Sequence, residues 1–82
     1  MTQQMKDIFR FRRERDRALL TGDIFEVRRF AQHWFPNVPP AKSTRSEIAA
    51  MHKAIVDADT LPRFYRLRSR AWLLANGFEL PT

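Results

Sequence analysis

Cationic side chains recur along two stretches of the sequence at spacings that would place them on single helix faces. In the first stretch four cations are spaced 4, 3 and 4 residues apart: Lys6, Arg10, Arg13 and Arg17. At a rise of about 1.5 Å per residue they would form a stripe about 16 Å long. The second stretch, near the C-terminus, holds Arg63, Arg66 and Arg70. A guanidinium group pairs in bidentate fashion with phosphates and carboxylates, so the chemistry predicted for both stripes is anion binding.

The net charge is distributed in a way that supports this interpretation. Fifteen Lys and Arg residues stand against nine Asp and Glu residues, which gives +6. The excess lies in residues 1–22 and 61–82, at +3 each, whereas residues 23–60 are balanced. Like charges four residues apart on a helix repel one another, and an anionic partner would relieve that repulsion. An ordinary solvated face, partly neutralised by Asp7 and Glu14, is the alternative.

A second candidate feature is an aromatic flank formed by Tyr65, Arg68 and Trp72, which share one side of a helix. Rings beside an arginine could stack on unpaired bases or on a protein partner. They could equally fill the gap to a neighbouring helix, with Arg68 in a cation–π contact. A homodimer seam made of Tyr65, Trp72 and Leu73 is a further alternative.

Other polar side chains are expected to serve packing. Arg12 and Asp16 lie four residues apart and could pair with each other, and Arg15 could reach an acid such as Asp57 or Asp59. Such a network would fix helix packing, because removal of one partner would strand a buried charge.

Catalysis, metal binding and cofactor binding are not expected. His52 is predicted to be a hydrogen-bonded core histidine, and His33 belongs to a different segment, so the four ligands of a zinc site are not assembled. The chain has no cysteine and only two glycines, Gly22 and Gly77, too few for a glycine-rich phosphate loop. We therefore predict a protein that is not an enzyme and takes no cofactor.

Caps and periodicity predict four helices, at about 3–20, 24–35, 45–58 and 61–76. The expected end signals are, in chain order, Thr2, Gly22, Asp23 with Glu26, the capping box Thr44-Arg45-Ser46-Glu47, Asp59 or Thr60, Pro62 and Gly77. Pro36, Pro39 and Pro40 prevent the second helix from continuing. The predicted fold class is all-α, a small single-domain bundle of four helices over residues 1–82.

Apolar spacing assigns a core face to each predicted helix. The expected core residues are Met5, Ile8 and Leu19, then Ile24, Val27, Ala31, Trp34 and Phe35, then Ile48, Met51, His52 and Ile55, and finally Phe64, Leu67, Ala71, Leu74 and Ala75. Phe78 is expected to fold back on Leu73 at the end of the last helix. The tight junction before that helix also leaves a helix-turn-helix as an alternative, with the second arginine stripe on its recognition helix.

Short segments spread over most of the chain resemble a group of small proteins encoded in bacterial prophages and related islands. They are Arg15-Asp16-Arg17-Ala18-Leu19-Leu20 followed by Asp23, then His52-Lys53-Ala54, Leu61-Pro62, Ser69-Arg70-Ala71-Trp72-Leu73 and Gly77-Phe78. The resemblance implies a phage-related accessory protein in the cytoplasm of a bacterial host and brings no activity with it. Phage accessory proteins of this size often bind host machinery, including as inhibitors of CRISPR effector complexes.

The sequence therefore predicts a basic helical module that binds nucleic-acid backbone or a nucleoprotein through its arginine stripes. The alternative is an inhibitor that covers an acidic surface of a host effector protein with the same stripes. A membrane partner is not expected, because no apolar run approaches the length of a membrane span.

Overall fold

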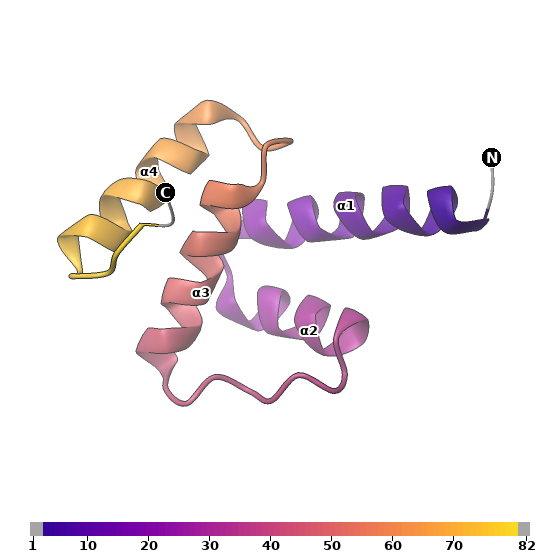
Figure 1. Cartoon of the computed structure of the whole chain (residues 1–82), viewed down its shortest axis with the longest axis horizontal. Helices are drawn as coiled ribbons and strands as arrows, with labels where there is room; N and C mark the ends of the chain where they lie inside the picture. Colours follow the sequence, from indigo (N-terminus) through magenta and orange to yellow (C-terminus); the bar gives the residue numbers. More distant parts are fainter. Residues whose placement is uncertain (1–2, 81–82) are drawn as a thin grey trace. The chain divides into compact units, whose positions relative to one another are not determined.

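The computed structural model describes residues 3–80, which form helices joined by loops and turns (Figure 1). The helices are α1 (Gln3–Thr21), α2 (Ile24–Trp34), α3 (Thr44–Asp57) and α4 (Arg63–Ala75). The chain divides at the Pro39–Pro40 bond into two compact units, called here unit 1 (α1 and α2) and unit 2 (α3 and α4). The predicted all-α class with four helices is confirmed for the described residues. A single domain over residues 1–82 stays a prediction.

The turn between α1 and α2 is built from local hydrogen bonds that the sequence signals. Gly22 adopts a left-handed conformation, with a φ of 66°, and its N–H donates to the Leu19 carbonyl at 3.1 Å. A residue without a Cβ takes that conformation at no steric cost, so α1 ends there. Asp23 then caps α2, because its side chain accepts from the Phe25 N–H at 2.9 Å. The predicted cap Thr2 lies outside the described residues.

The starts of α3 and α4 differ from the sequence prediction. The N-cap of α3 is Ser43 and not Thr44, and its Oγ accepts from the Ser46 N–H at 3.1 Å. Helix α4 begins one residue after Pro62, which occupies the N-cap without a side-chain hydrogen bond, so neither Asp59 nor Thr60 is the cap. Proline fits at a helix start because its missing N–H would have no helical partner there.

The C-terminal end of α4 follows the prediction. Gly77 has a φ of 79°, and the Phe78 N–H donates to the Leu73 carbonyl at 2.9 Å, the hydrogen bond of a Schellman motif. The Phe78 ring stacks on Trp72, with the ring centres 6.0 Å apart. The chain after α4 is thereby folded back against the helix it has just left.

In unit 1, α1 and α2 run in opposite directions (Figure 1). They pack against each other through aromatic rings. The Phe11 ring lies 5.4 Å from Phe30, 5.2 Å from Trp34 and 5.8 Å from Phe35, measured between ring centres. The pairs of Phe11 with Trp34 and with Phe35 are edge-to-face, an arrangement that stabilises packing beyond the area it buries. The expected α1 core is therefore wrong for Met5 and Ile8, which are exposed. Phe11, one turn after Ile8, makes the contact with α2 instead.

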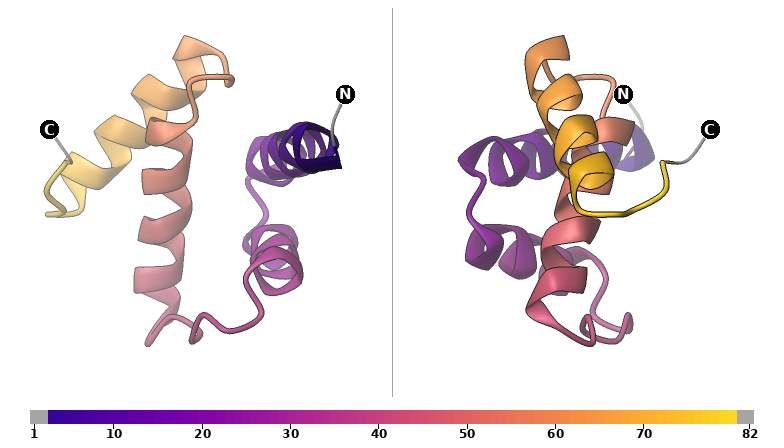
Figure 2. Two further views of the ribbon diagram at one scale, coloured as in Figure 1. Left: turned by 45° about the vertical axis from the view of Figure 1, so that its right-hand side comes forward. Right: turned by 90° about the vertical axis from the view of Figure 1, so that its left-hand side faces the viewer.

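In unit 2, α3 and α4 also run in opposite directions, and one side of α4 packs on α3 (Figure 2). The buried residues of this unit are Ala49, Met51, Ile55, Ala58, Leu61, Ser69 and Leu73. Leu73 is completely buried, at 0% exposure. The expected core face of α3 is confirmed for Met51 and Ile55, with His52 half-buried beside them.

The expected core face of α4 is wrong. Phe64, Leu67 and Leu74 are exposed, as are Ala71 and Ala75, whereas Ser69 and Leu73 on another side of the helix are buried. The regular apolar spacing of α4 lies on its exposed side, so periodicity selects the wrong side and the contact with α3 decides instead. The small Ser69 side chain allows α4 to approach α3 closely, and Leu73 fills the contact.

Because Leu73 is buried and Leu74 is exposed, replacing each by alanine should change stability to very different extents. Replacing the buried Leu73 in Leu73→Ala leaves a cavity and should lower the free energy of unfolding by about 3 kcal/mol. The matched control Leu74→Ala removes the same atoms from an exposed position and should change stability by less than about 0.5 kcal/mol. Urea unfolding followed by tryptophan fluorescence measures both. A larger loss of stability in Leu74→Ala than in Leu73→Ala would show that the side of α4 that carries Leu74 is the buried one.

Candidate binding surfaces

The four cations of the first predicted stripe form an exposed ridge along α1, called here the α1 ridge. Lys6, Arg10, Arg13 and Arg17 are all exposed, and helix α1 runs without interruption through them. Their regular spacing on a continuous helix keeps them on one side of it. Unit 1 therefore presents a row of positive charge to solvent.

One cation of the α1 ridge is held in place by neighbouring side chains. Arg10 Nε lies 3.7 Å from Glu14 Oε1, and its guanidinium lies 5.2 Å from the centre of the Trp34 ring. Glu14 Oε2 accepts a hydrogen bond of 2.6 Å from Trp34 Nε1. Glu14 thus partly neutralises Arg10, as the sequence suggested, and also ties α1 to α2. The Glu14–Trp34 bond had no sequence signal, because the two residues are 20 positions apart.

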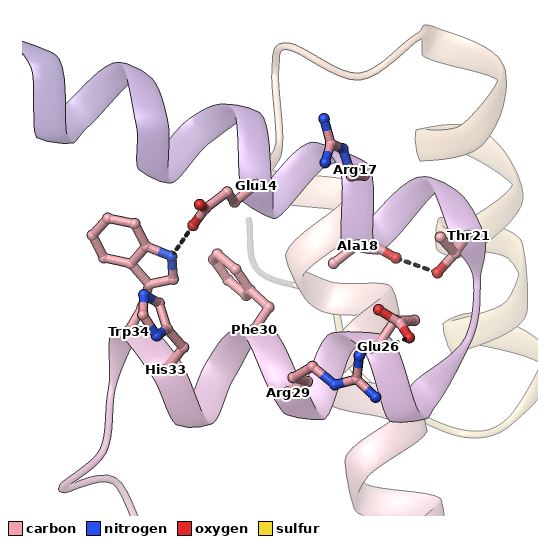
Figure 3. A pocket seen from close by; sticks show the side chains of 9 residues that line it. All are labelled: Glu14, Arg17, Ala18, Thr21, Glu26, Arg29, Phe30, His33 and Trp34. Carbon is pink, nitrogen blue, oxygen red and sulfur yellow. Dashed lines mark hydrogen bonds and ion pairs between the residues drawn. The ribbon is translucent and has the colours of Figure 1, made fainter.

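A groove of about 350 Å³ opens between α1 and α2 beside the α1 ridge (Figure 3). It is lined by Glu14, Arg17, Ala18, Thr21, Glu26, Arg29, Phe30, His33 and Trp34. Two acids balance two arginines in this lining, and Arg29 Nη1 lies 3.6 Å from Glu26 Oε1. The Arg17 side chain points away from α2 (Figure 3). The groove therefore has no excess charge to select an anion, and the cationic surface is the ridge itself.

The second predicted stripe is only partly available on α4. Arg63 and Arg70 are exposed, but Arg66 is half-buried, and its Nε is enclosed without a hydrogen-bond partner among the described residues. The expectation that all three arginines lie opposite the helix core is wrong, because the buried side of α4 is the one that carries Ser69 and Leu73. Arg66 borders that buried side, whereas Arg63 and Arg70 border the exposed apolar residues.

The predicted aromatic flank is engaged inside unit 2. Trp72 stacks on His52, with ring centres 4.3 Å apart and planes 21° apart, and also on Phe78. The Arg68 guanidinium lies 5.8 Å from the centre of the Tyr65 ring, within cation–π range. Tyr65 and Trp72 are half-buried. These contacts favour the gap-filling interpretation over a platform for unpaired bases.

His52 is hydrogen-bonded, as predicted, and the partner is a buried serine of α4. Its Nδ1 lies 2.9 Å from the Ser69 Oγ, which is buried. Burial lowers the pKa of His52 below its ordinary value of 6.5, and the positive charge of Arg68 lowers that pKa further. His52 is therefore held neutral in unit 2, in a packing role.

The ion pair expected between Arg12 and Asp16 has a different donor. Arg15 Nε, adjacent in sequence, donates to Asp16 Oδ1 at 3.0 Å, and both side chains are partly buried, whereas Arg12 is exposed. The Arg15 guanidinium also lies 6.0 Å from the centre of the Phe11 ring. Arg12 is thus an exposed cation of α1 that lies off the α1 ridge.

Within residues 3–80, no group of three or more His, Asp or Glu side chains is placed to hold a metal ion. No helix in the same part of the chain is both long enough and apolar enough to cross a membrane. Two exposed features with a consistent chemistry are the α1 ridge and the apolar side of α4. Sequence reasoning assigned the latter to the core and so missed it as a surface.

The state of His52 predicts how stability depends on pH. Because its pKa is lowered in the folded protein, the unfolded chain takes up the proton first as the pH falls. The stability contributed by neutral His52 is complete above about pH 6.5 and is lost as the pH falls through the folded-state pKa. The melting temperature should therefore decrease as the pH is lowered from about 7.5 to about 5.5. The decrease should be smaller in His52→Gln.

Replacing the exposed histidine in His33→Gln is the matched control and should leave the decrease as it is in the unmodified chain. Thermal unfolding followed by circular dichroism at several pH values measures all three proteins. An identical pH dependence in the unmodified chain and in His52→Gln would contradict the role given to His52.

Comparisons of the chain with protein-family models, with curated proteins and with solved structures found no match. The exposed cations of α1 and the exposed apolar side of α4 therefore carry the functional inference.

Proposed function

We propose that this chain is a non-catalytic basic module that binds nucleic-acid backbone, alone or in a nucleoprotein, through the α1 ridge. The observation that carries the proposal is the exposure of all four ridge cations: Lys6, Arg10, Arg13 and Arg17. They repel one another at i, i+3 and i+4 spacing, so the free ridge carries an electrostatic cost that a row of phosphates would relieve. The net charge of +6 attracts any polyanion at longer range.

The geometry of the α1 ridge suits a phosphate backbone. Neighbouring positions on a helix face lie about 5–6 Å apart between Cβ atoms, and the ridge is about 16 Å long. Four cations on duplex DNA would release counterions and give a slope of log K against log salt of about −3.6. Backbone contacts of this kind carry no sequence information, so binding with little sequence preference is expected.

The arginines of α4 contribute unequally to this proposal. Arg63 and Arg70 are exposed and could contact the same kind of polyanion, whereas Arg66 is half-buried and less available. The ridge on α1 is therefore the principal contact. An accessory role in a phage or prophage, as the resemblance implies, is compatible with it and stays a prediction.

Charge reversal on the α1 ridge tests the proposal. The double variant Arg13→Glu, Arg17→Glu should weaken binding to a duplex oligonucleotide at least about tenfold at low salt and flatten the salt slope by about 2. The matched control Arg12→Glu, Arg28→Glu makes the same change in net charge at exposed arginines outside the ridge. It should lose less affinity and keep most of the slope. Fluorescence anisotropy with duplex and single-stranded oligonucleotides across a salt series measures these quantities.

Two results would overturn the proposal. One is the absence of oligonucleotide binding by the unmodified chain at low salt. The other is an equal loss of affinity in the ridge variant and in the control, which would attribute binding to net charge and not to the ridge. Circular dichroism of each variant verifies that helix content is retained.

A further inference from the structure

The exposed side of α4 carries a row of large apolar side chains that unit 2 leaves uncovered. Phe64 is 66% exposed, Leu67 50% and Leu74 56%, and Ala71 lies exposed between them. The row extends over about 15 Å of helix. Single exposed apolar residues are ordinary, but a row along three turns of one helix marks an interaction surface.

The spacing of this row is that of an amphipathic helix face and, over one and a half heptads, fits a coiled-coil seam. Its members follow one another at 3, 4 and 3 residues, which are the a, d, a and d positions of successive heptads: Phe64, Leu67, Ala71 and Leu74. The two g positions are Arg63 and Arg70, and the e position between them is Arg68. These arginines are exposed. The surface, called here the α4 seam, is thus an apolar heptad row bordered by positive charge on both sides.

The internal packing of unit 2 holds the α4 seam outward. Leu73 is fully buried, and Ser69 is hydrogen-bonded to His52 of α3. Trp72 is stacked on His52 from the same side of the helix. A rotation of α4 that buried Leu67 would break these contacts, so exposure of the seam is a consequence of a satisfied core.

We propose that the α4 seam docks an amphipathic helix of a partner protein, with apolar residues facing the row and Asp or Glu at its flanking positions. In such a pair, apolar side chains of the partner insert between those of α4, and Ala71 leaves a recess for a large one. Acidic groups at the partner's e and g positions would meet Arg63, Arg68 and Arg70 as interhelical ion pairs. This surface is distinct from the α1 ridge and goes beyond the nucleic-acid binding proposed above.

Charge argues against a second copy of this chain as the occupant. In a parallel pair of α4 helices the g arginine of one copy would face the e arginine of the other. In an antiparallel pair, g would face g and e would face e, again arginine against arginine. Like charges at these positions select against the pairing, so the seam favours a different, acidic helix.

The regular spacing also argues for a protein helix over a phosphate backbone or an anionic lipid surface. Phosphates would pair with the arginines but would leave Phe64, Leu67 and Leu74 in water. A bilayer would also accept an apolar helix face, but only a partner helix would insert a side chain into the recess that the small Ala71 leaves in the row.

A designed peptide pair tests the proposal. The probe is a three-heptad peptide with Leu at a and d and Glu at e and g, which repels itself and is mostly unfolded alone. The control peptide has Lys at e and g. Mixing the full chain with the acidic peptide should increase helicity by circular dichroism and give saturable binding by calorimetry. The basic peptide should bind at least about tenfold more weakly.

Variants of the chain assign the binding to the α4 seam. Leu67→Ser and Leu74→Ser change exposed residues and should each weaken the acidic peptide about tenfold or more. Reversal of Arg63, Arg68 and Arg70 to Glu should exchange the preference between the acidic and basic peptides. The ridge variant Arg13→Glu, Arg17→Glu should keep its peptide affinity, which separates this proposal from nucleic-acid binding.

A chemical measurement reports exposure of the seam directly. Because the chain has no cysteine, a thiol introduced by Leu67→Cys is the only one present. It should react with iodoacetamide at nearly the rate of the unfolded chain and be protected by the acidic peptide, whereas a thiol introduced by Leu73→Cys should be protected in both conditions.

Three results of the thiol and peptide measurements would overturn the proposal. They are slow alkylation of Leu67→Cys without peptide, equal affinity for the acidic and basic peptides, and no binding of the acidic peptide at about 100 μM. Binding of an oligonucleotide or of anionic phosphatidylserine vesicles that is lost in Leu67→Ser would assign the seam to those surfaces and would also overturn it.

Discussion

The hydrogen bond between Ser69 Oγ and His52 Nδ1 marks the side of α4 that is turned away from solvent. It lies in the contact between α3 and α4, where Ser69 is 3% exposed and Leu73 is fully buried. Rotation of α4 would exchange this hydrogen bond, worth about 1 kcal/mol net, for one to water, and would also lose the burial of Leu73 and the stacking of Trp72 on His52. The position of every arginine on α4, and hence the chemistry of its outer surface, follows from this contact.

Helix ends were predictable because the groups that make them are neighbours in sequence. Gly22 and Gly77 take the left-handed conformations expected of them, and Asp23 caps α2 through its own side chain. The start of α3 was displaced by one residue, because Ser43 and Thr44 offer equivalent hydroxyls and only the backbone conformation distinguishes them. Local chemistry thus determines where helices begin and end to within about two residues.

The choice of helix face was not predictable in the same way. On α4 the regular apolar row is the one that contains Leu67, whereas the buried Leu73 has only polar residues and glycine three and four positions away. The side that is buried depends on the contact of Ser69 with His52, 17 positions earlier. On α1 the Phe11 ring contacts Phe30, Trp34 and Phe35 of unit 1, although Met5 and Ile8 have the better periodicity. The sequence did hold a signal for α4, since arginine at both e and g positions is typical of a seam for a charged partner and not of a core.

The arginines beside the α4 seam can lie along its apolar side chains while no partner is bound. A guanidinium group is weakly hydrated, and its aliphatic stem can lie along an apolar surface while the charge stays in solvent. Arg68 shows this behaviour, because its guanidinium lies 5.9 Å from the centre of the Phe64 ring and 5.8 Å from that of Tyr65. Arg68, which would pair with an acidic partner, therefore already lies against Phe64 of the α4 seam before that partner binds, and leaves that residue 66% exposed. Lysine, a compact and strongly hydrated charge, would provide the same repulsion between copies but less of this cover.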